Sequence, residues 1–255
     1  MKPDLRGLAV PAALMVLAEA GMRLNQVQSD ALARPTEVAG ALWQAVRDGS
    51  VWLSSGQTLW AALAGLALGG GLGLLLGLWL GLSRRAAQAS TLSVELLRPV
   101  PSVALIPLSM LVFGFGSGME IAVVAFTCFW PMLILTQAAV RQVEPRLLEV
   151  AQMLGFPPLA RVTKIVLPAA LPRIFMAFRL SVGIALVVGV TVEIAANPQG
   201  LGYALMNAQQ SLRPDLMFAL VLWIGLMGWG LSAGLLALQH RWFRHSLPGG
   251  TGGQS

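Results

Sequence analysis

The chain carries few side chains that could perform covalent or metal chemistry, and their spacing argues against both. Cys128 is the only cysteine, and it lies in an apolar run. No disulfide can form within the chain, and the thiol is expected to behave as a small buried hydrophobic group. His240 and His245 have no cysteine or carboxylate cluster beside them, so no metal site is predicted.

Nucleotide and nucleophile motifs are also missing. No Gly-x-x-x-x-Gly-Lys-Ser/Thr sequence occurs, so the chain lacks the usual loop that cradles nucleotide phosphates. Residues 114–118 place Ser117 among glycines, but the strand-turn-helix setting and the partner histidine of a nucleophile elbow are absent. This stretch is interpreted as a tight outer turn, and no enzyme activity is predicted.

Two charged residues lie inside apolar runs, where ionisable groups are rare and usually face a protein interior. Arg179 is close to the start of its run and is expected to snorkel to a membrane surface. Glu193 is at the far end of the same run, shortly before Asn197-Pro198. A carboxylate would repel an anionic solute, so Glu193 is expected to cap an outer gate or to accept hydrogen bonds from backbone groups.

The composition explains why so few polar groups are available. Hydrophobic residues make up 56% of the 255 residues and charged residues 11%, whereas a soluble globular chain has about 25% charged residues. Lipid is therefore the expected solvent. The net charge of +6 is spread between the apolar runs, so it indicates a membrane surface and not nucleic acid.

The elements that carry these residues are predicted to be membrane-spanning helices. A helix needs roughly 20 apolar residues to cross a bilayer. We expect an all-α polytopic membrane protein of one domain, residues 1–255, with a disordered Gly-rich tail at 248–255. The six expected spans are about 7–22, 57–82, 99–118, 121–140, 174–193 and 216–239.

The first apolar run has a second interpretation. Lys2 and Arg6 precede it, and Ala18-Glu19-Ala20 has the form of a cleavage site, so the run could be a signal peptide. In a retained helix, Glu19 and Arg23 are spaced to form an ion pair.

Lys and Arg residues predict the orientation of the spans. If both termini are cytoplasmic, the outer segments hold only Arg23, Arg34, Arg47 and Arg213, and the other thirteen basic residues are cytoplasmic, Arg98 among them.

Small residues and prolines single out two of the spans. Glycines recur every fourth position from Gly65 to Gly81, which predicts a helix face on which another backbone packs closely. The next expected span, 99–118, contains Pro99, Pro101 and Pro107, which weaken a helix. In lipid its freed carbonyls need protein or cavity water, so this span is expected to be kinked, either beside a pore or without contact to solute.

The longest cytoplasmic segment, 141–173, has the pattern of two short helices joined by a sharp bend. Glu144-Pro145 suits a helix start, and Gly155 suits the left-handed position that ends a helix. Pro157-Pro158 then forces a turn before a second helix at 159–166. Both helices have an apolar side, which requires a partner surface or a bilayer surface.

The spacing within this segment resembles the EAA loop of ATP-binding-cassette (ABC) importer permeases. The matching positions are Glu149-Val150-Ala151, Gly155 and Ile165-Val166-Leu167-Pro168. Further similarity to the sulfonate, taurine and nitrate branch comes from Arg98-Pro99-Val100-Pro101, Leu105-Ile106-Pro107-Leu108, and Glu193 followed by Gly200-Leu201-Gly202-Tyr203. Val150, where the family usually has alanine, and the double proline depart from the pattern.

The resemblance implies a type I importer fold in a bacterial inner membrane. It also implies a second permease copy, two ATP-binding subunits that hold ATP-Mg, an external solute-binding protein, and no cofactor in this chain. The residues expected to contact an ATP-binding subunit are Glu149, Ala151, Gly155, Phe156, Leu159 and Arg161, with Ile165, Leu167 and Pro168 ending the motif. Those expected to line the path are Arg98, Pro99, Pro101, Pro107 and Glu193. The solute is expected to be a small anion such as a sulfonate, taurine or nitrate.

Alternatives remain from the residues alone. For the loop, amphipathic helices with Arg161 and Lys164 on a polar face could lie on the bilayer. For the whole chain, one alternative is a transporter driven by an ion gradient, although its halves show no evident inverted repeat, and another is a membrane-embedded enzyme or assembly scaffold.

Overall fold

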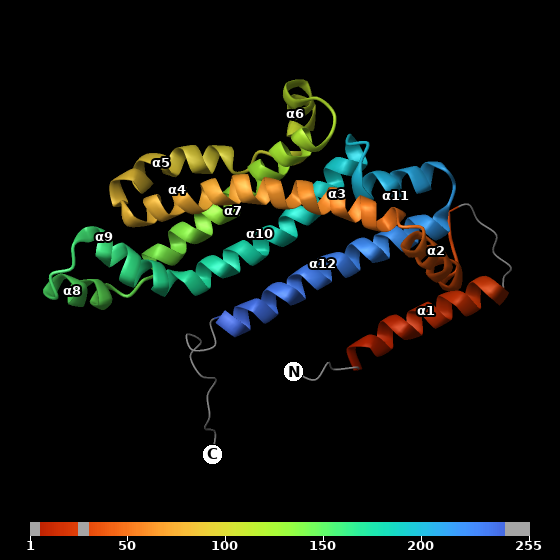
Figure 1. Ribbon diagram of the computed structural model, residues 1–255, viewed down its shortest axis with the longest axis horizontal. Helices are drawn as coiled ribbons and strands as arrows, with labels where there is room; N and C mark the ends of the chain where they lie inside the picture. Colours follow the sequence, from red (N-terminus) through yellow and green to blue (C-terminus); the bar gives the residue numbers. More distant parts are fainter. Residues whose placement is uncertain (1–5, 25–30, 243–255) are drawn as a thin grey trace, which may run out of the picture.

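The computed structural model describes residues 6–24 and 31–242, and every element within them is helical. The tail at 248–255 lies outside these residues. Long helices lie side by side in an elongated bundle (Figure 1), with α8 and α9 at one end and α2 and α11 at the other. The elements are α1 Arg6–Leu24, α2 Pro35–Arg47, α3 Ser50–Gly65, η1 Leu66–Gly70, α4 Gly71–Leu82, α5 Arg84–Leu97, η2 Ser102–Leu105, α6 Ile106–Phe113, α7 Ser117–Arg141, α8 Pro145–Met153, α9 Pro158–Arg161, η3 Val162–Val166, α10 Leu167–Ala195, α11 Gly200–Gln210 and α12 Pro214–Trp242.

Fewer helices could cross a membrane than the six predicted. Four helical stretches of the described residues are long and apolar enough: Ser50–Leu82, Ser117–Arg141, Pro158–Ala195 and Pro214–Trp242. A fifth is possible if Arg84–Leu97 and Ser102–Phe113 together form one broken span. The first predicted span corresponds to α1, which is not among these candidates.

Helix α7 occupies the centre of the bundle. The glycine-rich face of the helical stretch Ser50–Leu82 packs directly against it. A side chain at Gly69 would overlap the backbone carbonyl of Ala125, and one at Gly77 would approach the Leu133 carbonyl oxygen to 2.5 Å. The close-packing face predicted from the glycine spacing is therefore confirmed. A π turn, η1, interrupts the stretch Ser50–Leu82 within this line of close contacts, which we call the seam. The other glycines of the seam against α7 are Gly65, Gly73 and Gly81.

The predicted third span is not a single helix. After Leu82 the chain turns, and α5 runs back along α4 (Figure 1) before the backbone bends by 80° between α5 and the η2–α6 segment. The break contains Pro99 and Pro101, as the predicted kink requires. Arg98 therefore lies at this break, a full helix away from Arg84, and not in a loop directly after the second span.

The second helix of the predicted bend is also different. It was expected to be a separate segment at 159–166, but α9, η3 and α10 form one continuous helical stretch, Pro158–Ala195. The π turn at Val162–Val166 directly precedes Pro168, where a proline removes a backbone donor. The helix continues through Pro168 and Pro172 instead of ending there.

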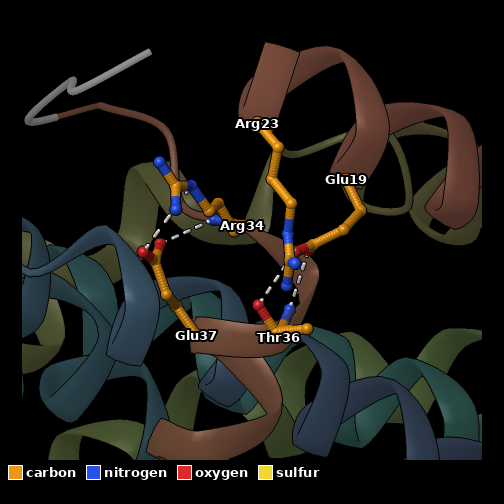
Figure 2. A network of polar contacts seen from close by, with 5 residues as sticks. All are labelled: Glu19, Arg23, Arg34, Thr36 and Glu37. Carbon is orange, nitrogen blue, oxygen red and sulfur yellow. Dashed lines mark hydrogen bonds and ion pairs between the residues drawn. The ribbon is translucent and has the colours of Figure 1, made fainter. Parts of the chain in front are cut away.

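A polar network joins α1 to α2 (Figure 2). Arg23 Nε donates to Glu19 Oε1 at 2.6 Å, which confirms the predicted pair. Glu19 also accepts from the backbone N–H and the hydroxyl of Thr36, at 3.2 and 3.0 Å. Arg34 and Glu37 cap α2, with the Arg34 backbone N–H donating to Glu37 Oε2 at 2.8 Å. Helix α2 was not predicted from the sequence.

Candidate functional site

A stable bend, which we call the hinge (Pro145–Arg161), occupies one end of the bundle. Gly155 has a φ of +72°, in the left-handed region predicted for it. The backbone N–H of Phe156 donates to the Ala151 carbonyl at 3.0 Å, and that of Gly155 donates to the Gln152 carbonyl at 3.0 Å. These two bonds satisfy carbonyls at the end of α8 and close it in a Schellman arrangement.

Two basic side chains stabilise the far side of the hinge. Arg161 Nε donates to the Phe156 carbonyl at 2.7 Å, and Lys164 Nζ lies 5.6 Å from the centre of the Phe156 ring, a cation–π distance. The bend is therefore fixed by contacts within the chain, and it does not need a partner to keep its shape.

The hinge exposes large apolar side chains and buries the small side chain of Ala151. Met153 is 88% exposed and Leu159 76%, whereas Ala151 is fully buried. Glu149 is exposed on α8. The base of the hinge packs on the bundle through the buried side chains of Val143, Val166 and Ala170 with Ala139 and Val140 of α7. Ile165 and Leu167 are half-buried at this base, and Pro168 is exposed.

At the opposite end, three side chains cap the first turn of α11, an arrangement that we call the clasp. The N–H groups of Gly200, Leu201 and Gly202 have no partners within their own helix. They donate in turn to Gln57 Oε1 at 3.0 Å, Thr58 Oγ1 at 2.9 Å and Glu193 Oε2 at 2.8 Å. Helices α3 and α10 thus hold the start of α11, where a carboxylate also complements the helix dipole.

The clasp explains the glycines that follow Glu193 in the sequence. A side chain at Gly200, where φ is +89°, would overlap the Glu193 carboxylate, and one at Gly202 would overlap the Val190 carbonyl oxygen. Only glycine lets the carboxylate reach the backbone of α11 here. The prediction that Glu193 accepts a hydrogen bond from a backbone donor is confirmed.

A second buried carboxylate beside the clasp was missed. Glu120, in the first turn of α7, is 1% exposed, and its Oε2 accepts from Asn197 Nδ2 at 2.6 Å. This bond ties α7 to the turn between α10 and α11. The sequence contains a feature that could have indicated a buried carboxylate: Glu120 is the single charge between two apolar runs that were assigned to separate spans.

The residues predicted to line a path do not all lie together. Pro99 and Pro101 are exposed at the break after α5, and Pro107 is exposed at the start of α6. Arg98 lines a cavity with α7 and α10 residues. Glu193 is 2% exposed and belongs to the clasp.

Comparisons with known proteins show the family of the chain. Residues 69–244 match the family described as binding-protein-dependent transport system inner membrane component. The chain is 32% identical over 224 residues to a Bacillus subtilis protein named as the aliphatic sulfonates transport permease SsuC, covering 88% of this chain and 81% of that protein. It is 29% identical over 198 residues to the taurine transport system permease TauC of Escherichia coli, covering 78% and 72%.

Solved structures of importers show the same fold. A chain of the methionine ABC transporter MetNI, in an inward-facing conformation, superposes with a TM-score of 0.62 at 16% identity, covering 75% of this chain and 93% of that one. A chain of an amino acid ABC transporter gives the same TM-score and identity over 78% and 98%. The chain therefore belongs to the family of binding-protein-dependent transport system inner membrane components, and it is the permease subunit of an ABC importer that works with ATP-binding and solute-binding partners.

Proposed function

We propose that this permease forms the path of a small anion and that an ATP-binding subunit drives it by seating on the hinge. The observation that carries the proposal is the pre-formed bend at Gly155, with the apolar side chains of Met153, Leu154 and Leu159 exposed around it. A rigid, apolar projection of this kind suits insertion into a groove, because no conformational entropy is lost in shaping it on contact.

The contacts of the hinge favour a protein partner over a lipid surface. An interfacial helix needs Lys and Arg on its polar face. Arg161 instead bonds the Phe156 carbonyl, and Lys164 lies over the Phe156 ring. The carboxylates of Glu149 on α8 and of Glu144 at its start are both exposed, against the single exposed guanidinium of Arg146 on this helix. The two carboxylates would face anionic headgroups unfavourably.

A single helical stretch could transmit a movement of the hinge to the opposite end of the bundle. The stretch Pro158–Ala195 is one helical body of 38 residues, roughly 57 Å long at 1.5 Å per residue. It begins in the hinge and carries Glu193 of the clasp near its other end. Closure of an ATP-binding subunit pair would thus displace the clasp and α11 as a rigid-body motion.

The wider assembly is proposed from the family. We place the whole chain, 1–255, in one permease domain, paired with a second copy, with both termini and the hinge cytoplasmic and the clasp facing the solute-binding protein. The relatives are named for aliphatic sulfonates and taurine, which supports a small sulfonate-like anion as solute. ATP hydrolysis is assigned to the partner subunit, and this chain is proposed to have no enzymatic activity of its own.

Transport driven by an ion gradient is less well supported. It would call for ionisable groups that are free to load and release ions near the middle of the membrane. Glu120 and Glu193 are buried, but they lie near the clasp end and their carboxylates hold Asn197 and the Gly202 backbone. One oxygen of each carboxylate is held at the α10–α11 turn, and the other has no hydrogen-bond partner among the described residues.

Single-cysteine cross-linking tests the proposed joint, because the native Cys128 is fully buried. We expect Met153→Cys to form a cross-link with the ATP-binding subunit of the purified complex. Leu212→Cys is the matched control, since Leu212 is 64% exposed between α11 and α12 at the clasp end. If the two variants cross-link equally, or if only Leu212→Cys reacts, the assignment of the hinge is wrong.

A further inference from the structure

A cavity of about 330 Å³ lies beside the broken third span. Its walls come from α7 through Trp130 and Pro131, from α10 through Leu180, and from the break itself through Arg98 and Ser102. Trp130 is close to the midpoint of α7, and Leu180 is central in the stretch Pro158–Ala195. The cavity therefore lies about halfway between the hinge and the clasp, at the depth where a solute would cross the middle of a bilayer.

Arg98 brings a positive charge to this depth without an internal counter-charge. Within residues 6–24 and 31–242, no carboxylate forms an ion pair with it, and the residues that line the cavity include no aspartate or glutamate. A guanidinium at membrane depth is unfavourable unless water or an anion compensates it. Its planar set of N–H donors matches the oxygens of a sulfonate or carboxylate group.

A second hydrogen-bond donor lies on the α7 wall of the cavity. The buried indole N–H of Trp130 has no acceptor among the described residues. Phe126 and Phe129 pack edge-to-face on Trp130, with ring centres 5.8 and 4.9 Å away. These contacts fix the indole in place, so an anion that accepts its hydrogen bond loses little to reorganisation.

Apart from the hydroxyl residues Ser102 and Thr127, the rest of the lining is apolar, and it includes Leu180 and Ile184 of α10 and Ile134 and Leu135 of α7. We propose that this cavity is a transit subsite for a small organic oxyanion, with its oxygens on Arg98 and Trp130 and its short alkyl group against α10. The inference rests on the proposed transport of an anion and adds a selectivity to it. An ammonium group on the solute would find no carboxylate in the lining, so simple alkyl oxyanions should bind better than zwitterions of the same size.

Fluorine NMR can measure binding to the permease without the solute-binding protein. The probe is trifluoroethanesulfonate, titrated into the complex of permease and ATP-binding subunit in lipid nanodiscs. We expect line broadening that saturates, and displacement of the probe by ethanesulfonate at lower concentrations than by taurine. Arg98→Gln should weaken binding about tenfold or more, as for loss of a charge-assisted hydrogen bond, and Trp130→Phe should weaken it by a smaller factor.

Controls separate a lost site from a lost fold. Arg85→Gln changes an exposed guanidinium at the other end of α5 and should leave the affinity unchanged. Arg98→Lys keeps the charge without the planar fork and should bind with intermediate affinity. Equal affinity in Arg98→Gln and the unmodified complex, or equal displacement by taurine and ethanesulfonate, would overturn the subsite. Neither result would affect the hinge, which the cross-linking experiment tests separately.

Discussion

The hinge and the clasp lie at the two ends of one helical stretch and are built on opposite principles. The hinge keeps its shape through its own backbone bonds and leaves its apolar side chains in the open. The clasp is formed by three separate helices, and its polar groups are buried or half-buried and are bonded across them. The exposed apolar surface of the hinge is the reason for proposing that a partner docks there, whereas the clasp joins elements of the same chain.

Gly202→Ala tests the tighter of the two regions and should have the largest effect. The new methyl group would meet the Val190 carbonyl oxygen and approach Glu193 Cβ to 2.7 Å. We expect a loss of about 3 kcal/mol in the free energy of unfolding, at the upper end of overpacking effects. Gly155→Ala is the comparison, since nothing lies within 4 Å of a methyl group there. Left-handed strain alone should lower stability by about 1 kcal/mol. Thermal unfolding followed by tryptophan fluorescence measures both, and equal losses would contradict the contrast.

Glu193→Ala removes one of the three caps of α11. The Gly202 N–H would stay buried without an acceptor, and we expect about 1–3 kcal/mol of destabilisation. Glu193→Gln keeps an acceptor oxygen at the same place and should recover most of the stability. The measurement is the unfolding temperature of both variants in nanodiscs. A glutamine variant as unstable as the alanine variant would mean that the carboxylate charge, and not the hydrogen bond, holds the helix.

Gly155→Val tests whether the shape of the hinge matters for coupling. A β-branched residue is strained at a φ of +72° by about 1–2 kcal/mol, whereas asparagine tolerates this region. We expect Gly155→Val to lower solute uptake in proteoliposomes several-fold at unchanged ATP concentration, and Gly155→Asn to retain most of it. If the two variants transport equally well, the bend is not the joint.

Met153→Ser should have the smallest effect on stability. The side chain is 88% exposed, so its replacement removes little burial within the chain. We expect an unfolding temperature of the isolated permease within error of the unmodified protein, together with weaker co-purification of the ATP-binding subunit. A clear loss of stability in the isolated permease would show that this surface packs within the chain.

The parts of the fold that follow from local rules were predicted, and those that depend on tertiary contacts were not. The left-handed Gly155 and the glycine face follow from the absence of a Cβ, which the sequence displays directly. The path of α5 back along α4 and the 80° break depend on packing against α7, and prolines indicate a kink but not its angle. The continuous helix through Pro168 and Pro172 was missed because the π turn that precedes them has no sequence signature.

The candidate site shows the same division. The hinge was predicted because its residues are close together in sequence, and its role stays a prediction until a partner is cross-linked. The clasp joins Gln57 and Thr58 to residues about 143 positions away, and two polar residues in an apolar run do not reveal what they bind. The cytoplasmic position of Arg98 stays a prediction, and the structure places this exposed residue at the break between α5 and the η2–α6 segment.

The glycine seam limits how the permease can change shape. Where α4 meets α7, backbone lies against backbone, and a rotation of α4 by one residue position, about 100°, would turn leucine side chains such as Leu74 and Leu78 into the space that the glycines leave. The two helices must therefore move together as one rigid body. We expect a gating movement to involve surfaces with looser contacts, such as α12, which is largely unburied in the structure.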